Sequence, residues 1–323
     1  MAATDRLPTR PFGDRGVDVS IMGLGCGGPS RLGTRGTVNS ETTAAAVAVL
    51  EIALASGVTL LDTAESYGTQ PAIAEVIRAC RDDVVLCTKK AAIEHDASGG
   101  TRFVTAAEYA AGIDGCLREL GVEAVDVFFL HGITPEEYGY ASTELLPVLE
   151  RAQRDGKCRW IGVTEMFQTD TTHAMLTRAL DDGWPEVVMV GFNPLNQSAR
   201  ETILPRTTSM GVATLGMFAV RRALSNPARL RELLDDLRLR GLWDAEPEQR
   251  EEPLGFLGAW PDVIDAAYRY SLHEPGLDCT LMGTGDLGHL QTNLDTARRG
   301  PLASDVHRRL SDLFRGLDSV TGH

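Results

Sequence analysis

The feature that most constrains the fold of this chain is a regular alternation of short apolar segments with longer segments of helical character. The apolar segments are four to seven residues long and rich in Val, Ile and Leu, as buried parallel strands are. The expected strands are residues 21–25, 58–62, 83–89, 125–131, 158–164, 187–192, 212–216 and 279–282. The expected helices are residues 41–56, 71–80, 106–120, 144–155, 169–180, 200–210, 262–273 and 289–297. Eight strands that each lead into a helix predict an α/β fold, a single (β/α)8 TIM barrel.

Two extensions complete the expected fold. Residues 10–20 predict a β-hairpin before the first barrel strand, with its turn at residues 13–16, and an extra helix is expected at the C-terminal end. The sequence contains no internal repeat and no linker, so we expect one domain, residues 1–323. An open doubly wound sheet is the alternative, but residues 23–28 only partly resemble its glycine-rich turn, and Pro29 stands where its first helix should start.

Charge and composition narrow the possible partners. The net charge is −14 and the pI is about 5, which disfavours nucleic acid because an acidic surface repels phosphates. No apolar stretch reaches the roughly 18 residues that a membrane-spanning helix needs, and the N-terminus lacks an apolar signal core. Six widely spaced cysteines form no C-x-x-C pair. We therefore expect a cytoplasmic protein with reduced thiols, no bound metal and a small-molecule substrate.

Polar side chains follow three successive expected strands. The strand 58–62 ends in Asp62 and is followed by Tyr67, the next strand ends in Lys89, and the third ends in His131. Taken singly, Asp62 is a candidate helix cap, Tyr67 its packing partner, and the other two are ordinary surface or structural residues. Because the carboxyl ends of barrel strands meet on one face, we expect the four side chains to lie together.

These motifs resemble those of the aldo-keto reductase family. The pattern G-x-x-x-x-D-T-A-x-x-Y-G matches residues 57–68, and the T-K and L-H pairs match residues 88–89 and 130–131, within a similarity that runs from about residue 10 to residue 297. The resemblance implies an NAD(P)-dependent oxidoreductase that reduces an aldehyde or ketone, or oxidises the corresponding alcohol or sugar, by hydride transfer.

The resemblance assigns a role to each of the four residues. Tyr67 is the expected proton donor, and a nearby Lys89 is expected to lower the phenol pKa from its usual value near 10. Asp62 would pair with Lys89, and His131 would orient the substrate oxygen. Lys90 is a rival to Lys89, but it should face the opposite side of its strand. A histidine at position 131, rather than the glutamate of relatives that reduce carbon–carbon double bonds, favours carbonyl chemistry.

Four later segments match the family's cofactor contacts. The residues so assigned are Thr164, Glu165, Asn193, Met217, Phe218, Gly283, Thr284, Gly285, His289 and Asn293. Glu165 departs from the family pattern, which has Asn there. Glycines before a helix form a natural phosphate site. The family favours NADP(H), but residues 283–296 contain no Lys or Arg, and Asp286 would repel a phosphate if it pointed inward. NADP(H) is therefore only slightly favoured over NAD(H).

Two other functions remain open at this stage. One is a nicotinamide-nucleotide-binding regulatory subunit on the same fold. The other is a metal-dependent lyase or hydrolase that uses Asp62, Glu65 and His131, although no H-x-H or H-x-x-E pair supports it. Trp243 and Trp260, near the polar insertion 239–258, either line a pocket or pack internally. The adjacent arginines 221 and 222 would either attract an anionic substrate or belong to the surface.

Overall fold

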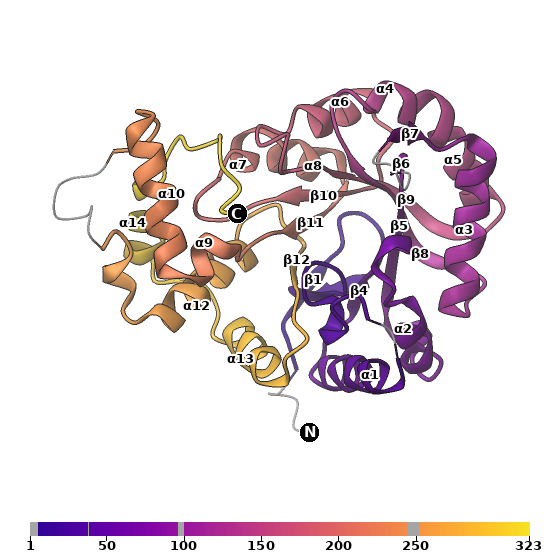
Figure 1. Cartoon of the computed structure of the whole chain (residues 1–323), viewed down its shortest axis with the longest axis horizontal. Helices are drawn as coiled ribbons and strands as arrows, with labels where there is room; N and C mark the ends of the chain where they lie inside the picture. Colours follow the sequence, from indigo (N-terminus) through magenta and orange to yellow (C-terminus); the bar gives the residue numbers. More distant parts are fainter. Residues whose placement is uncertain (1–5, 38, 96–99, 245–251) are drawn as a thin grey trace.

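A computed structural model of the chain describes residues 6–37, 39–95, 100–244 and 252–323. Eight parallel strands close into a barrel in which chain order is also spatial order (Figure 1). The strands are β3 (Met22–Gly25), β4 (Leu60–Asp62), β5 (Val85–Ala91), β8 (Val125–Ile133), β9 (Cys158–Glu165), β10 (Val187–Gly191), β11 (Ala213–Met217) and β12 (Cys279–Met282). The predicted TIM barrel is confirmed.

The helices that follow these strands cover the outside of the barrel. They are α1 (Ser40–Ala55), α2 (Gln70–Ile77), α3 (Ala106–Leu120), α5 (Leu146–Arg154), α6 (Ala174–Asp182), α7 (Ala199–Thr202), α8 (Leu204–Met210), α12 (Trp260–Leu272) and α13 (Leu287–Arg298), with the extra helix α14 (Ser304–Leu313) after them. Local signals start several of them: Asn39 caps α1 and Thr105 caps α3, each in a reciprocal capping box. Every helix in the described part of the chain is too short or too polar to cross a bilayer.

The predicted N-terminal hairpin closes the amino end of the barrel. Strands β1 (Thr9–Pro11) and β2 (Asp18–Ser20) pair antiparallel, and Phe12 between them is fully buried inside the barrel. Its ring meets Trp160 edge to face, with 6.1 Å between centroids. The amino end is thus filled by side chains, as is usual for a barrel of this size, and the carboxyl end remains for chemistry.

Two helices that were not expected lie between the seventh strand and the polar insertion 239–258, of which residues 245–251 lie outside the described part of the chain. Residues 222–239 are helical, in α9 (Arg222–Ser225) and α10 (Pro227–Leu239). The Asn226 side chain accepts from the backbone N–H groups of residues 228 and 229, and Pro227 occupies the first helical turn. Leucines 230, 234 and 237 then bury one face. Figure 1 shows α10 on one flank of the barrel, far from α3 on the opposite flank.

Other boundaries also differ from expectation. The helix expected over residues 169–180 begins only at Ala174, because His173 adopts a left-handed backbone conformation with φ +63°. A short helix α4 (Tyr138–Tyr140) and a π-helical turn (Ala141–Leu145) precede α5. A second hairpin, β6 (Ile93–His95) and β7 (Thr101–Phe103), was not expected. All six cysteines are free thiols.

Candidate active site

Two buried charges of opposite sign pair at the mouth of the barrel. Asp62 ends β4, and Lys89 lies in the neighbouring parallel strand β5, two residues beyond Cys87, which the register places opposite Asp62. The Lys89 ammonium donates to the Asp62 carboxylate and, at 2.9 Å, to the carbonyl oxygen of Thr63. Lys89 is 1% exposed and Asp62 4% exposed. The predicted ion pair is therefore present, and it fixes the lysine in position.

Tyr67 and His131 meet beside this pair. Tyr67 ends the short 3-10 helix Glu65–Tyr67 after β4, and His131 lies near the end of β8. The Tyr67 hydroxyl lies 3.3 Å from Nε2 of His131, and the Lys89 ammonium lies 5.3 Å from the centre of the phenol ring. The structure thus brings together all four side chains that the strand ends predicted, and they place a phenol, an imidazole and an ammonium around one point.

The electrostatics of this cluster differ from expectation at one residue. Burial and the Lys89 charge lower the pKa of His131 to about 3, so this imidazole is neutral at physiological pH. Burial is the largest single effect and lowers the Lys89 pKa, but the contact with Asp62 and the neighbouring Tyr67 together raise it above its usual value. For Tyr67, burial raises the phenol pKa by more than Lys89 lowers it. The expected net lowering of the Tyr67 pKa is therefore wrong: Lys89 only offsets part of the cost of burial.

Lys90 takes no part in the cluster. Its ammonium donates to Glu65 at 2.7 Å, on the outer side of β5, and its aliphatic chain lies against Gly112 of α3. The expectation that Lys89 and Lys90 face opposite sides is confirmed. Because Glu65 points to Lys90 while Asp62 points to Lys89, the acids invoked for a metal-dependent reaction do not converge. Within the described residues no three His, Cys, Asp or Glu side chains gather as a metal site.

Gly27, which the sequence did not single out, sets the position of Tyr67. A methyl group at residue 27 would lie only 2.2 Å from Cε2 of the tyrosine ring. Any side chain there would displace the phenol from His131. The partial glycine pattern at residues 23–28 was the one feature of the sequence that pointed to Gly27. Without knowledge of the fold, that pattern indicated only a turn.

The Glu165 side chain is buried and bound by neighbouring residues, away from the barrel mouth. Its carboxylate accepts from Nδ1 of His173 at 2.9 Å and from the backbone N–H of Gly191 at 2.7 Å, and both side chains are completely buried. The His173 ring stacks on Phe167, with 5.5 Å between centroids and 8° between planes. The carboxylate is thus engaged by a histidine from the following loop, and the assignment of Glu165 as a cofactor contact stays a prediction.

Asn193 is likewise engaged. Its amide nitrogen donates to the carbonyl oxygens of Phe218 and Thr321, each at 3.2 Å, and its amide oxygen accepts from two backbone N–H groups at residues 195 and 196. The C-terminal residues 318–322 return to the barrel here, and Asn196 also donates to Val320 at 2.9 Å. Asn193 thus ties the C-terminal segment to the loop after β10, and its polar contact to a cofactor stays a prediction.

The remaining residues assigned to the nicotinamide side form one wall of the mouth. The Thr164 hydroxyl accepts from the N–H of Gly132 at 2.7 Å, which leaves its own proton for another acceptor. Met217 ends β11 and faces the barrel interior. Phe218 adopts φ +68°, stacks on Phe167, and is covered by the Arg221 guanidinium 4.0 Å from its centre. Arg221 is thereby in contact with an aromatic ring.

The segment after β12 is the part that best fits a dinucleotide. Gly283 is exposed, Gly285 is partly exposed, and the Thr284 hydroxyl accepts from the N–H of Asp286 at 3.1 Å. The His289 side chain is exposed at the start of α13. Asn293 is 7% exposed, and in the described part of the chain its amide makes no hydrogen bond. An open glycine loop followed by an unengaged amide suits a nucleotide that lies across the helix start.

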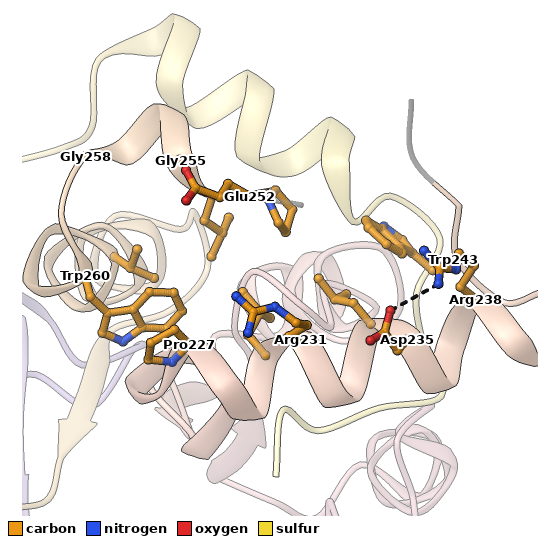
Figure 2. A pocket seen from close by; sticks show the side chains of 14 residues that line it. Pro227, Arg231, Asp235, Arg238, Trp243, Glu252, Gly255, Gly258 and Trp260 are labelled. Carbon is orange, nitrogen blue, oxygen red and sulfur yellow. Dashed lines mark ion pairs between the residues drawn. The ribbon is translucent and has the colours of Figure 1, made fainter. Parts of the chain in front are cut away.

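A separate cavity lies beside the inserted helix α10 (Figure 2). It has a volume of about 230 Å³ and is lined by Trp243 and Trp260, for which pocket lining and internal packing were both left open, with Arg231 between them. The indole N–H of Trp243 donates to the carbonyl oxygen of Leu313 at 2.9 Å, so this tryptophan also anchors α14. No residue of the Tyr67 cluster lines this cavity, so it is distinct from the candidate active site.

The closed barrel and its cluster of buried Asp62 and Lys89 beside the half-buried Tyr67 and His131 have the features that the sequence predicted for a barrel oxidoreductase. The model of the aldo/keto reductase family matches residues 23–233, about two thirds of the chain, and this protein belongs to that family.

Known relatives agree with this assignment. The chain is 26% identical over 299 residues to the aldo-keto reductase YhdN of Bacillus subtilis, covering 86% of this chain and 85% of that protein. Two solved structures share the fold. The holo form of the aldo-keto reductase AKR11C1 from Bacillus halodurans has a TM-score of 0.73 at 18% identity, covering 98% of each chain. An aldo/keto reductase from Klebsiella pneumoniae, in complex with NADP and acetate, has a TM-score of 0.64 at 19% identity, covering 95% of each chain.

Proposed function

We propose that this protein is a nicotinamide-nucleotide-dependent carbonyl reductase or alcohol dehydrogenase with Tyr67 as its proton donor. The observation that carries the proposal is the position of the Tyr67 hydroxyl, 3.3 Å from a neutral His131 and beside the buried pair of Lys89 and Asp62. Reduction of a carbonyl needs a proton donor and groups that stabilise negative charge developing on oxygen. All of these groups occur in this cluster.

Each side chain has a distinct task in this proposal. Tyr67 holds the transferable proton on its hydroxyl, and transfer of that proton leaves a phenolate that the Lys89 ammonium stabilises. Asp62 keeps Lys89 charged and fixed. His131 is neutral, so its Nε2 can carry a hydrogen and donate it to a carbonyl oxygen placed beside Tyr67. A nicotinamide would supply the hydride for reduction or accept it in the reverse direction.

Residues in the second half of the barrel are the candidates for binding such a cofactor. Gly283 and His289 are exposed, Gly285 is partly exposed, and the Asn293 amide is unengaged, which supports a role for this segment in binding the nucleotide; Thr284 supports the loop through its bonds to Asp286. Phe218 and Met217 form an apolar wall. The NADP in the Klebsiella structure supports the slight preference for NADP(H) given by the family. The substrate class is an aldehyde, a ketone or the corresponding alcohol.

Replacement of the phenol by a phenyl ring tests the proposal. Tyr67→Phe removes the proton donor and leaves the ring that packs on Gly27, so we expect turnover to fall by roughly 10³-fold or more, near the upper end for a lost proton-transfer group. Consumption of NADH and NADPH would be measured against a panel of aldehydes, ketones, aldoses and secondary alcohols, and cofactor binding by fluorescence titration. We expect the variant to bind cofactor as the wild type does. Full turnover in the variant contradicts the role of Tyr67.

The same panel separates the enzyme from a regulatory subunit. A wild-type protein that binds nicotinamide nucleotide but reduces or oxidises no member of the panel, and that co-purifies with a stoichiometric partner, would fit the second function instead. The intact cluster around Tyr67 favours catalysis, because a protein that only senses the nucleotide needs no buried proton donor.

A further inference from the structure

The cavity beside α10 has two largely apolar walls (Figure 2). One wall is α10, the other is formed by residues 252–263, which lead into α12, and an indole ring lies at each end. The apolar side chains that complete the walls are Pro227, Leu230, Leu234, Pro253, Leu254 and Val263. An apolar cavity of roughly 150 Å³ is large enough to bind benzene. The volume of about 230 Å³ therefore leaves room for a substituted aromatic ring.

Arg231, which lines this cavity from α10, is an unpaired cation. Its guanidinium makes no ion pair and no hydrogen bond with any described residue. The other arginines of α10 and its C-cap pair with acids of the same helix, namely Arg229 with Glu232, Arg238 with Asp235, and Arg240 with Asp236. Asp235 lies one turn after Arg231, but it pairs with Arg238 at 3.3 Å (dashed in Figure 2). An anion that entered the cavity would therefore meet a guanidinium that no carboxylate neutralises.

The acid on the opposite wall does not change this balance. Glu252 turns its carboxylate toward its own loop, where Oε2 would lie 3.2 Å from a methyl group on residue 255. The Arg231 side chain is exposed, so a ligand can reach it from solvent. The cavity thus combines apolar walls with one accessible positive charge.

The two indole N–H groups of the cavity differ in their partners. The indole of Trp243 donates to the carbonyl oxygen of Leu313 at 2.9 Å. The indole nitrogen of Trp260 is buried, and no described residue accepts its hydrogen. A buried N–H without an acceptor destabilises the folded chain, so an acceptor within its reach would be bound favourably. A ligand for this cavity should therefore carry a hydrogen-bond acceptor on an apolar body.

We propose that this cavity is a second binding site, separate from the barrel mouth, and that it takes a small aromatic carboxylic acid in its ionised form. The carboxylate would pair with Arg231, since a guanidinium binds a carboxylate through two parallel hydrogen bonds. The aromatic ring would pack between α10 and Trp260, since aromatic rings favour contact with an indole face. The site goes beyond the proposed function and does not depend on it.

Fluorine NMR titration of the full-length protein tests this proposal. The probes are 4-fluorophenylacetate and its neutral amide, each titrated at neutral pH into the wild type, Arg231→Gln and Arg229→Gln. Arg229→Gln is the matched control, because it removes the same charge from the same helix at an arginine that pairs with Glu232 and does not line the cavity. Melting temperatures check that both variants stay folded.

We expect the wild type to bind the acid about fivefold more tightly than the amide, the upper end for an ion pair that remains in contact with water. Arg231→Gln should remove this difference, and Arg229→Gln should keep it. Equal affinity of the wild type for acid and amide overturns the proposal, as does an equal loss of affinity for the acid in both variants.

A further variant separates this cavity from the barrel mouth. His131→Gln alters the candidate active site, and His131 does not line the cavity. We expect this variant to bind the acid as the wild type does. An acid that loses affinity in His131→Gln but not in Arg231→Gln binds at the barrel mouth, and that result overturns the second site. Turnover by the wild type and by Tyr67→Phe tests the proposed function separately, so the two proposals can fail independently.

Discussion

In the first half of the barrel, polar side chains at the ends of β4, β5 and β8 contact one another. In the second half, polar side chains at the end of β9 and just after β10 contact neighbouring loops. Asp62, Lys89 and His131 lie at the barrel mouth around Tyr67. Glu165 is bound by His173, and Asn193 by the C-terminal segment. We therefore propose that the same position at a strand's end serves catalysis in the first half and structure in the second, depending on which partner the side chain contacts.

The largest loss of activity in the first half of the barrel is expected from Lys89→Met. Loss of the ammonium removes the stabilisation of a Tyr67 phenolate, so we expect turnover to fall by roughly 10²- to 10⁴-fold. It also leaves Asp62 as an unpaired buried acid, which should lower the free energy of unfolding by about 3–5 kcal/mol. Steady-state kinetics and urea unfolding would measure the two effects.

Lys90→Met is the matched control, because this neighbouring lysine pairs outside the cluster with the half-exposed Glu65. We expect it to keep most of the activity. Comparable loss of turnover in both variants would mean that the inward side of β5 has no special role.

A smaller loss of activity is expected from Gly27→Ala. The added methyl group overlaps the Tyr67 ring, so the hydroxyl must move away from His131. A displacement of about 1 Å in a reacting group costs roughly 10²-fold in rate. We expect kcat to fall by about that factor while nucleotide affinity is kept, as measured by kinetics and fluorescence titration. Wild-type kcat in this variant would show that the close contact is relieved without moving the phenol.

The pH dependence of stability tests the burial of the neutral His131. The unfolded chain binds a proton at this histidine near pH 6.5, but the folded protein only near pH 3, so the unfolded state holds more protons between these values. Stability from this residue is complete above pH 6.5 and is lost as the pH falls, by up to about 1.4 kcal/mol per pH unit.

The measurement is urea unfolding of the wild type and His131→Gln at pH 7 and pH 5. We expect the wild type to lose more stability than the variant over this interval. Other buried histidines are present in both proteins and cancel in the difference. Equal losses in the two proteins would contradict the neutral state assigned to His131.

The smallest effect on function is expected in the second half of the barrel. Glu165→Gln removes the carboxylate that contacts His173 and Gly191 and should lower the free energy of unfolding by about 1–3 kcal/mol. Because the Glu165 carboxylate faces His173 and Gly191, we expect the affinity for nicotinamide nucleotide to stay as in the wild type. Thermal unfolding and nucleotide titration separate the two results, and a large loss of affinity would place Glu165 in the cofactor site.

Part of the active-site cluster and of the fold could be predicted from the sequence alone. Asp62, Lys89 and His131 were predictable because each lies at the end of an apolar run, and barrel strands end on one face. The start of α10 was also visible in principle, since Asn226 followed by Pro227 is a typical helix start.

The partners of Glu165 and Asn193 were not predictable in the same way. They depend on a left-handed residue at His173 and on a C-terminal segment 128 positions away from Asn193, and neither is encoded by local pattern or propensity. The position of Gly27 against Tyr67 also depends on two strand ends that meet only in the closed barrel.

Transfer of deuterium from cofactor to product shows whether this protein transfers hydride to a carbonyl with Tyr67 as the proton donor. Wild-type protein is incubated with nicotinamide cofactor deuterated at C4 of the reduced ring and with the carbonyl panel, and each alcohol is analysed by mass spectrometry. The account predicts one deuterium on the former carbonyl carbon of at least one product, and none above background with Tyr67→Phe. Alcohol that forms without deuterium at that carbon, or undiminished transfer in Tyr67→Phe, would contradict it.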